Sequence, residues 1–154
     1  MSECRLAIVF AVFPGLTQLS LTGPHEVLSR LPGGDVIVAS VAGGERENGK
    51  LAFGGLRRLA EVPACGVICV PGGAGVFDYA MRDQMFLGEV RRLAATARLV
   101  TSVCTGSLVL GRPVCCAASA QRQTGHGGKC SHPLARSRIR HGWFATATSS
   151  PVAE

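Results

Sequence analysis

Four short apolar runs, separated by segments rich in Gly, Pro and polar residues, constrain most strongly how this chain can fold. They consist mostly of β-branched and other apolar side chains, with little alternation of polar and apolar positions. Strands that are buried on both faces of a parallel sheet have this composition. We therefore predict strands over Arg5–Val12, Asp35–Val41, Gly66–Val70 and Arg98–Val103.

The segments between these strands predict helices. Apolar residues recur with helical spacing between Asp83 and Ala97. Pro24 is suited to the first position of a helix, and Thr22 or Gly23 stands where its cap would be. Helices are therefore predicted over 25–31, 83–97 and 105–110, and a short strand pair around 51–53.

Strands that alternate with helices indicate an α/β domain with a doubly wound parallel sheet, covered on both faces. In such domains the chemistry lies at the carboxyl ends of the strands. Three segments are expected to meet there, namely the loop 13–23, the Gly-rich loop 71–75 and Cys104.

The composition changes abruptly near Gly111. Residues 1–110 hold ten Lys or Arg and nine Asp or Glu, whereas residues 111–154 hold six and one. The second part also lacks the periodicity of helices or strands, so the expected sheet is incomplete after residue 110. We predict a truncated α/β domain over 1–111 and a disordered basic tail over 112–154.

The tail gives no support to a nucleic-acid or metal site. Its arginines show no aromatic interleaving and no helical face, so nucleic acid is not expected as a partner. No metal site is predicted either, because the spacing of five tail residues fits no standard zinc motif. These residues are Cys115, Cys116, His126, Cys130 and His132.

Membrane and secretory signals are not found. The longest apolar run, Leu6–Phe13, is much shorter than the about 18 residues that a membrane span needs, so no membrane partner is expected. The N-terminus lacks the basic start and cleavage site of a secretory signal, which makes the cytoplasm the expected location.

Cys65 and Cys69 are interpreted as buried apolar residues rather than as a redox or metal pair.

Cys104 stands between the last predicted strand and a helix. A sharp turn there would hold the thiol clear of the sheet, as a nucleophile elbow does, and the helix N-terminus would favour its thiolate form. The loop 71–75 could aim backbone N–H groups at the same point. A buried Cys without reactivity is the alternative, and the local pattern leaves both open.

Three motifs occur in order along the chain. They are Phe-Pro-Gly at 13–15 followed by Leu-Thr-Gly-Pro-His-Glu-Val at 21–27, Ile-Cys-Val-Pro-Gly-Gly at 68–73, and Val-Thr-Ser-Val-Cys-Thr-Gly at 100–106. This set resembles the ThiJ/PfpI superfamily, which implies a flavodoxin-like or class I glutamine amidotransferase-like fold. Within the superfamily it is most similar to the isonitrile hydratases. The ligand-binding domains of AraC-type transcriptional regulators carry similar motifs.

The resemblance to the hydratases implies cysteine-dependent hydration of an isocyanide, such as cyclohexyl isocyanide, to an N-substituted formamide. This is a lyase reaction and implies no cofactor. By resemblance, Cys104 would be the nucleophile, and Thr105, Gly72 and Gly73 would line its pocket. Gly23 is a further candidate for substrate binding.

Ser20 departs from the hydratase pattern, because the hydratases place an Asp for proton transfer at this position. A Ser hydroxyl cannot act as a carboxyl acid or base at pH 7, so we expect Ser20 to weaken hydration. The nearby Glu26 is expected to support the first turn of the helix after Pro24 rather than to replace that Asp. His25 is expected on the helix surface.

Two other functions stay open. The chain could be a small-molecule sensor like the AraC-type domains, which Ser20 favours because it replaces the Asp of the hydratases. It could also be a non-functional product of a frameshift. Family members commonly form homodimers, so the resemblance also allows for a second copy as partner.

The frameshift hypothesis rests on back-translation of residues 111–154. With the reading frame moved by two nucleotides, degenerate codons permit Ala-Ala-Gly-Leu-Leu-Arg-Gly-Lys-Arg-Ala-Thr and a second string, both similar to what the family carries after its cysteine. We therefore hypothesise that a shift near residues 110–112 replaced the native C-terminal half.

Overall fold

The computed structural model of the chain describes residues 6–111 and 145–146. In chain order its elements are β1 (Leu6–Ala11), α1 (Gln18–Leu28), β2 (Gly34–Ser40), β3 (Gly44–Asn48), β4 (Leu51–Arg58), the single turn η1 (Leu59–Glu61), β5 (Val67–Val70), the single turn η2 (Val76–Ala80), α2 (Gln84–Thr96), β6 (Leu99–Ser102), α3 (Gly106–Leu110) and β7 (Ala145–Thr146). The predicted strands and the predicted strand pair are all present. The four single strands end within about two residues of the expected positions where the structure describes them, whereas the strand pair extends from Gly44 to Arg58, well beyond the expected 51–53.

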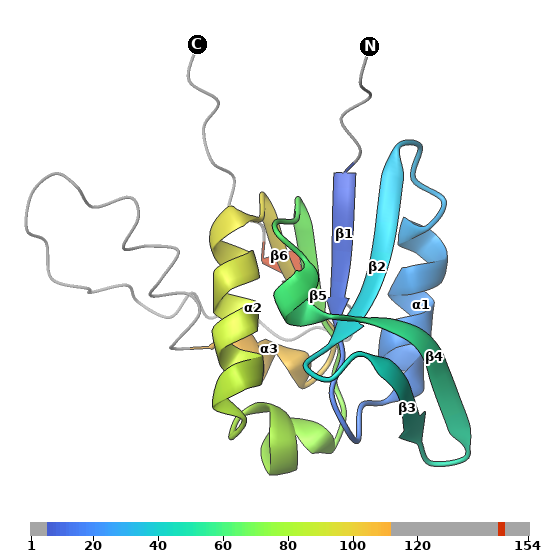
Figure 1. Cartoon of the computed structure of the whole chain (residues 1–154), viewed down its shortest axis with the longest axis vertical. Coiled ribbons are helices and arrows are strands. Elements are labelled where there is room, and N and C mark those ends of the chain that lie inside the picture. Colours follow the sequence, from blue (N-terminus) through green and yellow to red (C-terminus); the bar gives the residue numbers. More distant parts are fainter. Residues whose placement is uncertain (1–5, 112–144, 147–154) are drawn as a thin grey trace, which may run out of the picture.

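The strands form one mixed sheet in the order β3-β4-β2-β1-β5-β6-β7 (Figure 1). The inner neighbours, from β4 to β6, are parallel, and Ile8 of β1 is in register with Val36 of β2 and Val67 of β5. The two edge strands, β3 and β7, pair antiparallel to their neighbours. The predicted doubly wound α/β class is therefore confirmed, with antiparallel strands added at both edges.

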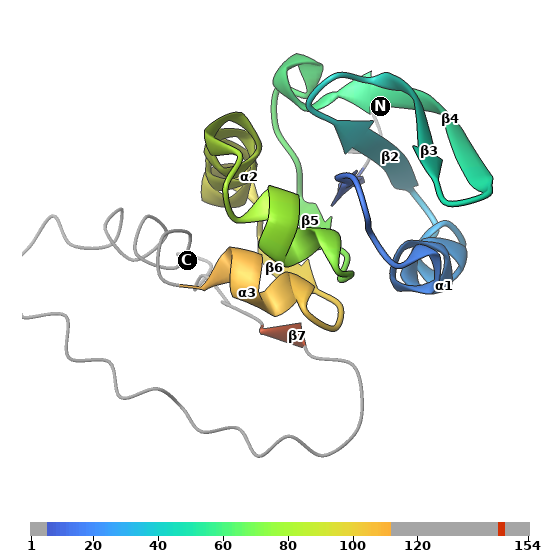
Figure 2. The same cartoon turned by 90° about the horizontal axis from the view of Figure 1, so that it is seen from below.

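Helices α1 and α2 cover opposite faces of the sheet (Figure 2). The chain moves from β1 to β2 in one direction and from β5 to β6 in the other, and right-handed crossovers then place their helices on opposite faces. All four residues of β5 are buried, as expected for a strand covered on both sides. On the α2 side, Phe13 and Phe86 pack edge to face with ring centroids 5.5 Å apart.

The first helix corrects the sequence prediction. Helix α1 begins at Gln18, with Thr17 as its N-cap residue, so it starts seven residues before His25. Pro24 lies inside this helix and does not open it. Because Ser20 and Leu21 pack into the interior from the first turns, tertiary burial outweighs the signal of a proline at a helix start.

Of the predicted tail, the structure describes Ala145–Thr146, which pair with Val100 and Thr101 of β6. The predicted disorder of the rest of the tail, and the five Cys and His residues weighed above as zinc ligands, lie outside the described residues. Within the described part, no helix is long and apolar enough to cross a membrane.

Candidate nucleophile site

Cys104 occupies a sharp turn between β6 and α3. Its φ is +52°, and it is the one non-glycine residue with positive φ in the described part of the chain. This backbone region is costly for a residue with a side chain and persists only where the surroundings hold it. The Val103 N–H donates to the Val70 carbonyl at 3.0 Å, and the Gly106 N–H donates to the Val103 carbonyl at 3.0 Å. Cys104 is exposed, so it does not fit the alternative of an inert buried cysteine.

Gly106 lets the turn pack directly against the end of β5. A Cβ at this position would lie 2.3 Å from the Val70 carbonyl oxygen and 2.6 Å from that of Pro71. No larger residue fits without moving α3 away from the loop after β5. The glycine therefore fixes the distance between the nucleophile turn and the loop 71–75.

That loop forms a cradle beside Cys104. A Cβ on Gly72 would lie 2.8 Å from the Cβ of Cys104, so the two residues are in direct contact. Gly73 has a φ of +148°, and its N–H donates to Thr105 Oγ1 at 2.9 Å. The Thr105 hydroxyl is also 3.2 Å from the Gly73 carbonyl, to which it donates. The structure thus brings together Cys104, Thr105, Gly72 and Gly73, four of the candidate residues.

The loop after β1 packs against this cradle. The Thr17 N–H donates to the Gly72 carbonyl at 2.8 Å, and the Gly75 N–H donates to the Gly15 carbonyl at 3.0 Å. Ser20 follows in the first turn of α1, where its N–H donates to the Thr17 carbonyl at 2.9 Å. Ser20 is buried, with 7% of its surface exposed. The expected meeting of three segments at the carboxyl edge of the sheet is therefore observed.

Gly23 lies farther along α1, where it lines a groove with Pro24, Val27 and Leu28. Its assignment to substrate binding stays a prediction.

The expectation that Glu26 supports the first turn of the helix was wrong. Glu26 lies in the last turns of α1 and pairs with Arg30 on the exposed surface. It cannot support the first turn, since α1 begins eight residues earlier.

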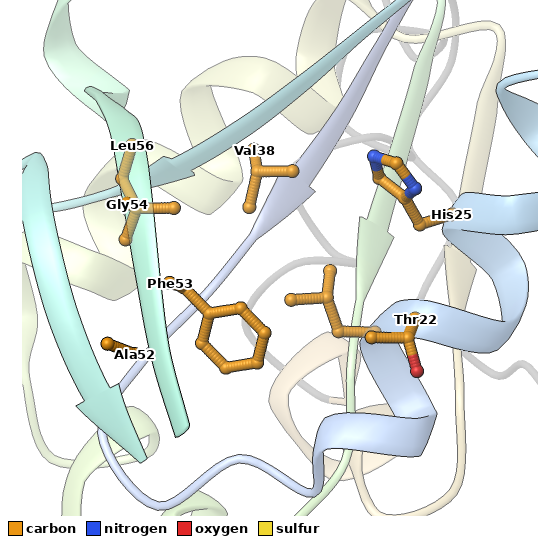
Figure 3. A pocket seen from close by; sticks show the side chains of 8 residues that line it. Thr22, His25, Val38, Ala52, Phe53, Gly54 and Leu56 are labelled. Atoms are coloured by element: carbon orange, nitrogen blue, oxygen red, sulfur yellow. The ribbon is translucent and has the colours of Figure 1, made fainter. Parts of the chain in front are cut away.

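His25 also differs from expectation, because it is half-buried instead of lying on the helix surface. Its ring centroid lies 5.9 Å from that of Phe10. It lines a cavity of about 270 Å³ between α1, β2 and β4, together with Leu21, Thr22, Val38, Ala52, Phe53, Gly54 and Leu56 (Figure 3). None of the cradle residues lines this cavity.

Cys65 and Cys69 are buried and free, as the sequence analysis interpreted them. Burial raises the pKa of the Cys65 thiol to about 11, against a weaker lowering by the hydrogen bond from Thr96. Burial likewise raises the pKa of Cys69. Both thiols therefore stay protonated at neutral pH, which leaves Cys104 as the exposed thiol among the described cysteines.

Two contributors to the cradle were not predicted. They are Thr17, whose backbone bonds to Gly72, and Asn48, whose side chain donates to the Leu16 carbonyl at 2.7 Å. Asn48 is far from every motif in the sequence, so only the folded hairpin β3–β4 brings it to this loop.

Comparisons with known proteins agree with the fold. No family model matches the chain. The crystal structure of a ThiJ/PfpI family protein from Pseudomonas syringae superposes with a TM-score of 0.65 at 28% identity, covering 74% of this chain and 46% of that one. The crystal structure of Drosophila melanogaster DJ-1beta superposes with a TM-score of 0.60 at 21% identity. The superposition covers 69% of this chain and 59% of the DJ-1beta chain, and at this identity it shows the fold alone. The chain belongs to the ThiJ/PfpI superfamily.

Within that superfamily, the chain is similar to a curated isonitrile hydratase from Pseudomonas putida. The two are 46% identical over an alignment of 113 residues that covers 69% of this chain and 46% of the hydratase. The chain therefore spans about half the length of this relative.

Proposed function

We propose that this chain carries the nucleophile half of an isonitrile hydratase, with Cys104 as the residue that attacks the isocyanide. The observation that carries the proposal is the exposed thiol of Cys104 on a strained turn, in contact with Gly72. The similarity to the curated hydratase supports the choice of reaction. The free thiols of the described cysteines support a cytoplasmic location.

The reaction balances without a cofactor. The Cys104 sulfur bonds to the terminal isocyanide carbon while that carbon gains a proton, which gives a thioimidate. Water then adds to the same carbon, the carbon–sulfur bond breaks, and the thiol regains its proton. The sum of the two steps is one isocyanide plus one water to one N-substituted formamide.

The cradle supplies the backbone groups that this chemistry needs. The N–H of Gly73 is already bonded to Thr105 Oγ1, so it holds the loop in place. The Thr105 N–H follows Cys104 directly in the chain and lies near Gly72, and neither this N–H nor that of Gly72 donates to an acceptor within the described residues. We propose that these two stabilise negative charge on the reacting group.

Ser20 limits the rate in this proposal. It is buried one turn after Thr17, but its hydroxyl cannot exchange a proton with the substrate as a carboxyl group does at neutral pH. Ser20→Asp is therefore expected to accelerate formamide formation by at least about 10²-fold, the lower range for a positioned acid or base. Ser20→Asn is the matched control, because asparagine has the shape of aspartate but no ionisable group.

The test measures N-cyclohexylformamide formed from cyclohexyl isocyanide by proton NMR. Wild type is expected to be slow, Ser20→Asp fast, and Cys104→Ala inactive in either background. Equal rates for Ser20→Asp and Ser20→Asn would contradict the role given to this position.

A second candidate function is a small-molecule sensor, and Ser20 is the observation that favours it, since binding needs no proton transfer. A sensor would bind an isocyanide or a related small ligand without consuming it. Saturable binding by calorimetry, with no formamide from wild type or from Ser20→Asp, would favour this function over the enzyme.

A further inference from the structure

We infer that Asn48 is a positioning residue for the nucleophile site, acting through a chain of hydrogen bonds that ends on Thr105. The inference rests on the proposed role of Cys104. Asn48 is the last residue of β3, at the turn of the β3–β4 hairpin, and it belongs to none of the three motifs.

The chain of hydrogen bonds begins at the Asn48 amide. Its Nδ2 donates to the Leu16 carbonyl at 2.7 Å, in a partly buried contact between residues 32 apart in the sequence. The Leu16 carbonyl and the Thr17 N–H belong to one peptide group. That N–H donates to the Gly72 carbonyl at 2.8 Å, so Asn48 and Gly72 hold the two polar ends of a single peptide plane.

A second peptide group continues the chain of hydrogen bonds toward Thr105. The Gly72 carbonyl and the Gly73 N–H also belong to one peptide group, and this N–H donates to Thr105 Oγ1 at 2.9 Å. Thr105 is bonded directly to Cys104 in the chain. Every bond runs in the same direction, with the donors on the Asn48 side and the final acceptor beside the nucleophile.

Aligned hydrogen bonds polarise one another, so the first donor strengthens those that follow. Without the Asn48 donor, the carbonyl of the buried Leu16 loses this partner, and the Leu16–Thr17 peptide is held only through its Thr17 N–H, so it can tilt about that bond. Rotation there reaches the cradle, because the space beside Gly73 Cα is filled by the Leu16 Cα and the Thr17 N, at 2.6 Å and 2.5 Å from an ideal Cβ. The Gly73 N–H, and with it Thr105, then shifts relative to the Cys104 thiol.

A purely structural role for Asn48 makes a different prediction. If the amide only fastens the hairpin to the domain, its loss loosens the fold and exposes the buried thiols of Cys65 and Cys69. If it positions the site, the reactivity of Cys104 changes while Cys65 and Cys69 stay protected. One experiment can follow all three thiols.

The experiment measures the rate of alkylation by iodoacetamide at each cysteine, by tandem mass spectrometry of the full chain after digestion, across the neutral pH range. Asn48→Asp and Asn48→Leu both keep the side-chain shape and remove the donor, one with a charge and one without. Glu47→Gln is the matched control, because Glu47 is exposed and its side chain points to the other face of β3.

Both Asn48 variants are expected to slow alkylation of Cys104 by about threefold to tenfold, the effect of one net hydrogen bond. Cys65 and Cys69 are expected to stay unlabelled, and Glu47→Gln to match wild type. An unchanged rate at Cys104, or a change that comes only with labelling of Cys65 and Cys69, would overturn the inference.

The readout is independent of isocyanide turnover. Slowed labelling of Cys104 in the Asn48 variants, together with no formamide from wild type or from Ser20→Asp, would support the positioning role and reject the proposed reaction. Formamide formation with unchanged labelling in both variants would support the reaction and reject the positioning role.

Discussion

Gly72 and Cys104 share a space that has room for one Cβ only. A methyl group on Gly72 would lie 2.8 Å from both the Cys104 Cβ and the Val103 carbonyl oxygen. Gly72→Ala is therefore expected to lower the free energy of unfolding by on the order of 1–3 kcal/mol and to slow alkylation of Cys104 at least about tenfold. Urea denaturation and thiol labelling measure the two effects.

Gly88→Ala is the control for that change. Gly88 is exposed on α2, and a Cβ there would meet nothing within 4 Å. The substitution is expected to stabilise the protein by about 0.5–1 kcal/mol, because alanine favours the helix, and to leave Cys104 unchanged. Equal effects of the two substitutions on Cys104 would contradict the close approach of Gly72.

Cys65 gives the stability a pH dependence. Its folded pKa of about 11 lies above the ordinary value of 9.0, so between these pH values the folded state keeps a proton that the unfolded state loses. The contribution of Cys65 to the free energy of unfolding is therefore expected to be constant below about pH 9 and to fall as the pH rises toward 11. Urea midpoints of wild type and Cys65→Ala near neutral pH and near pH 10 measure this. The variant should lose less stability over the interval, and an equal loss in both proteins would contradict the assignment.

Part of the candidate site could be predicted from the sequence. The site residues lie within three residues of the ends of β5 and β6, and parallel strands bring such positions to one edge of the sheet. They are Cys104, Thr105, Gly72 and Gly73. Asn48 carries no comparable signal, because its contact with Leu16 spans 32 residues and depends on how the hairpin folds back.

Helix α2 begins at a capping residue whose contribution can be measured. The Asp83 carboxylate accepts hydrogen bonds from the N–H groups of Met85 and Phe86, at 2.9 Å and 3.2 Å. Asp83→Ala is expected to cost about 1 kcal/mol, and Asp83→Asn less, because the amide oxygen still accepts. Thermal or urea unfolding measures the difference, and an Asp83→Ala protein as stable as wild type would contradict the cap.

The elements with strong local patterns were predicted from the sequence, and the exceptions have physical causes. Apolar runs predict the inner strands and helical spacing predicts α2, and the folded structure contains these elements where the patterns occur. The start of α1 was placed seven residues late, because Pro24 is a usual helix opener and is here tolerated in the interior. The turn η2 has no such pattern and follows from the packing of the loop after Gly73.

At the scale of the whole molecule, the structure describes the α/β unit through α3 and again at β7, and the chain spans about half the length of its curated relative. The frameshift hypothesis predicts that the gene holds an inserted or deleted base near codons 110–112, and that a chain translated in the restored frame unfolds at a higher urea concentration. Sequencing the gene through and beyond this region checks it. An uninterrupted frame that lacks the shifted strings would reject the hypothesis.

Covalent capture of the isocyanide tests the role of Cys104 most directly. Because Ser20 provides no carboxyl group to assist proton transfer, the thioimidate is expected to accumulate on wild type treated with cyclohexyl isocyanide. Peptide mass spectrometry should then show the mass of one isocyanide added at Cys104, and no such addition at the buried Cys65 and Cys69. The Cys104→Ala protein should show no adduct on this peptide. If wild type gained no mass at Cys104 and also formed no formamide, Cys104 would not be the nucleophile of an isonitrile hydratase.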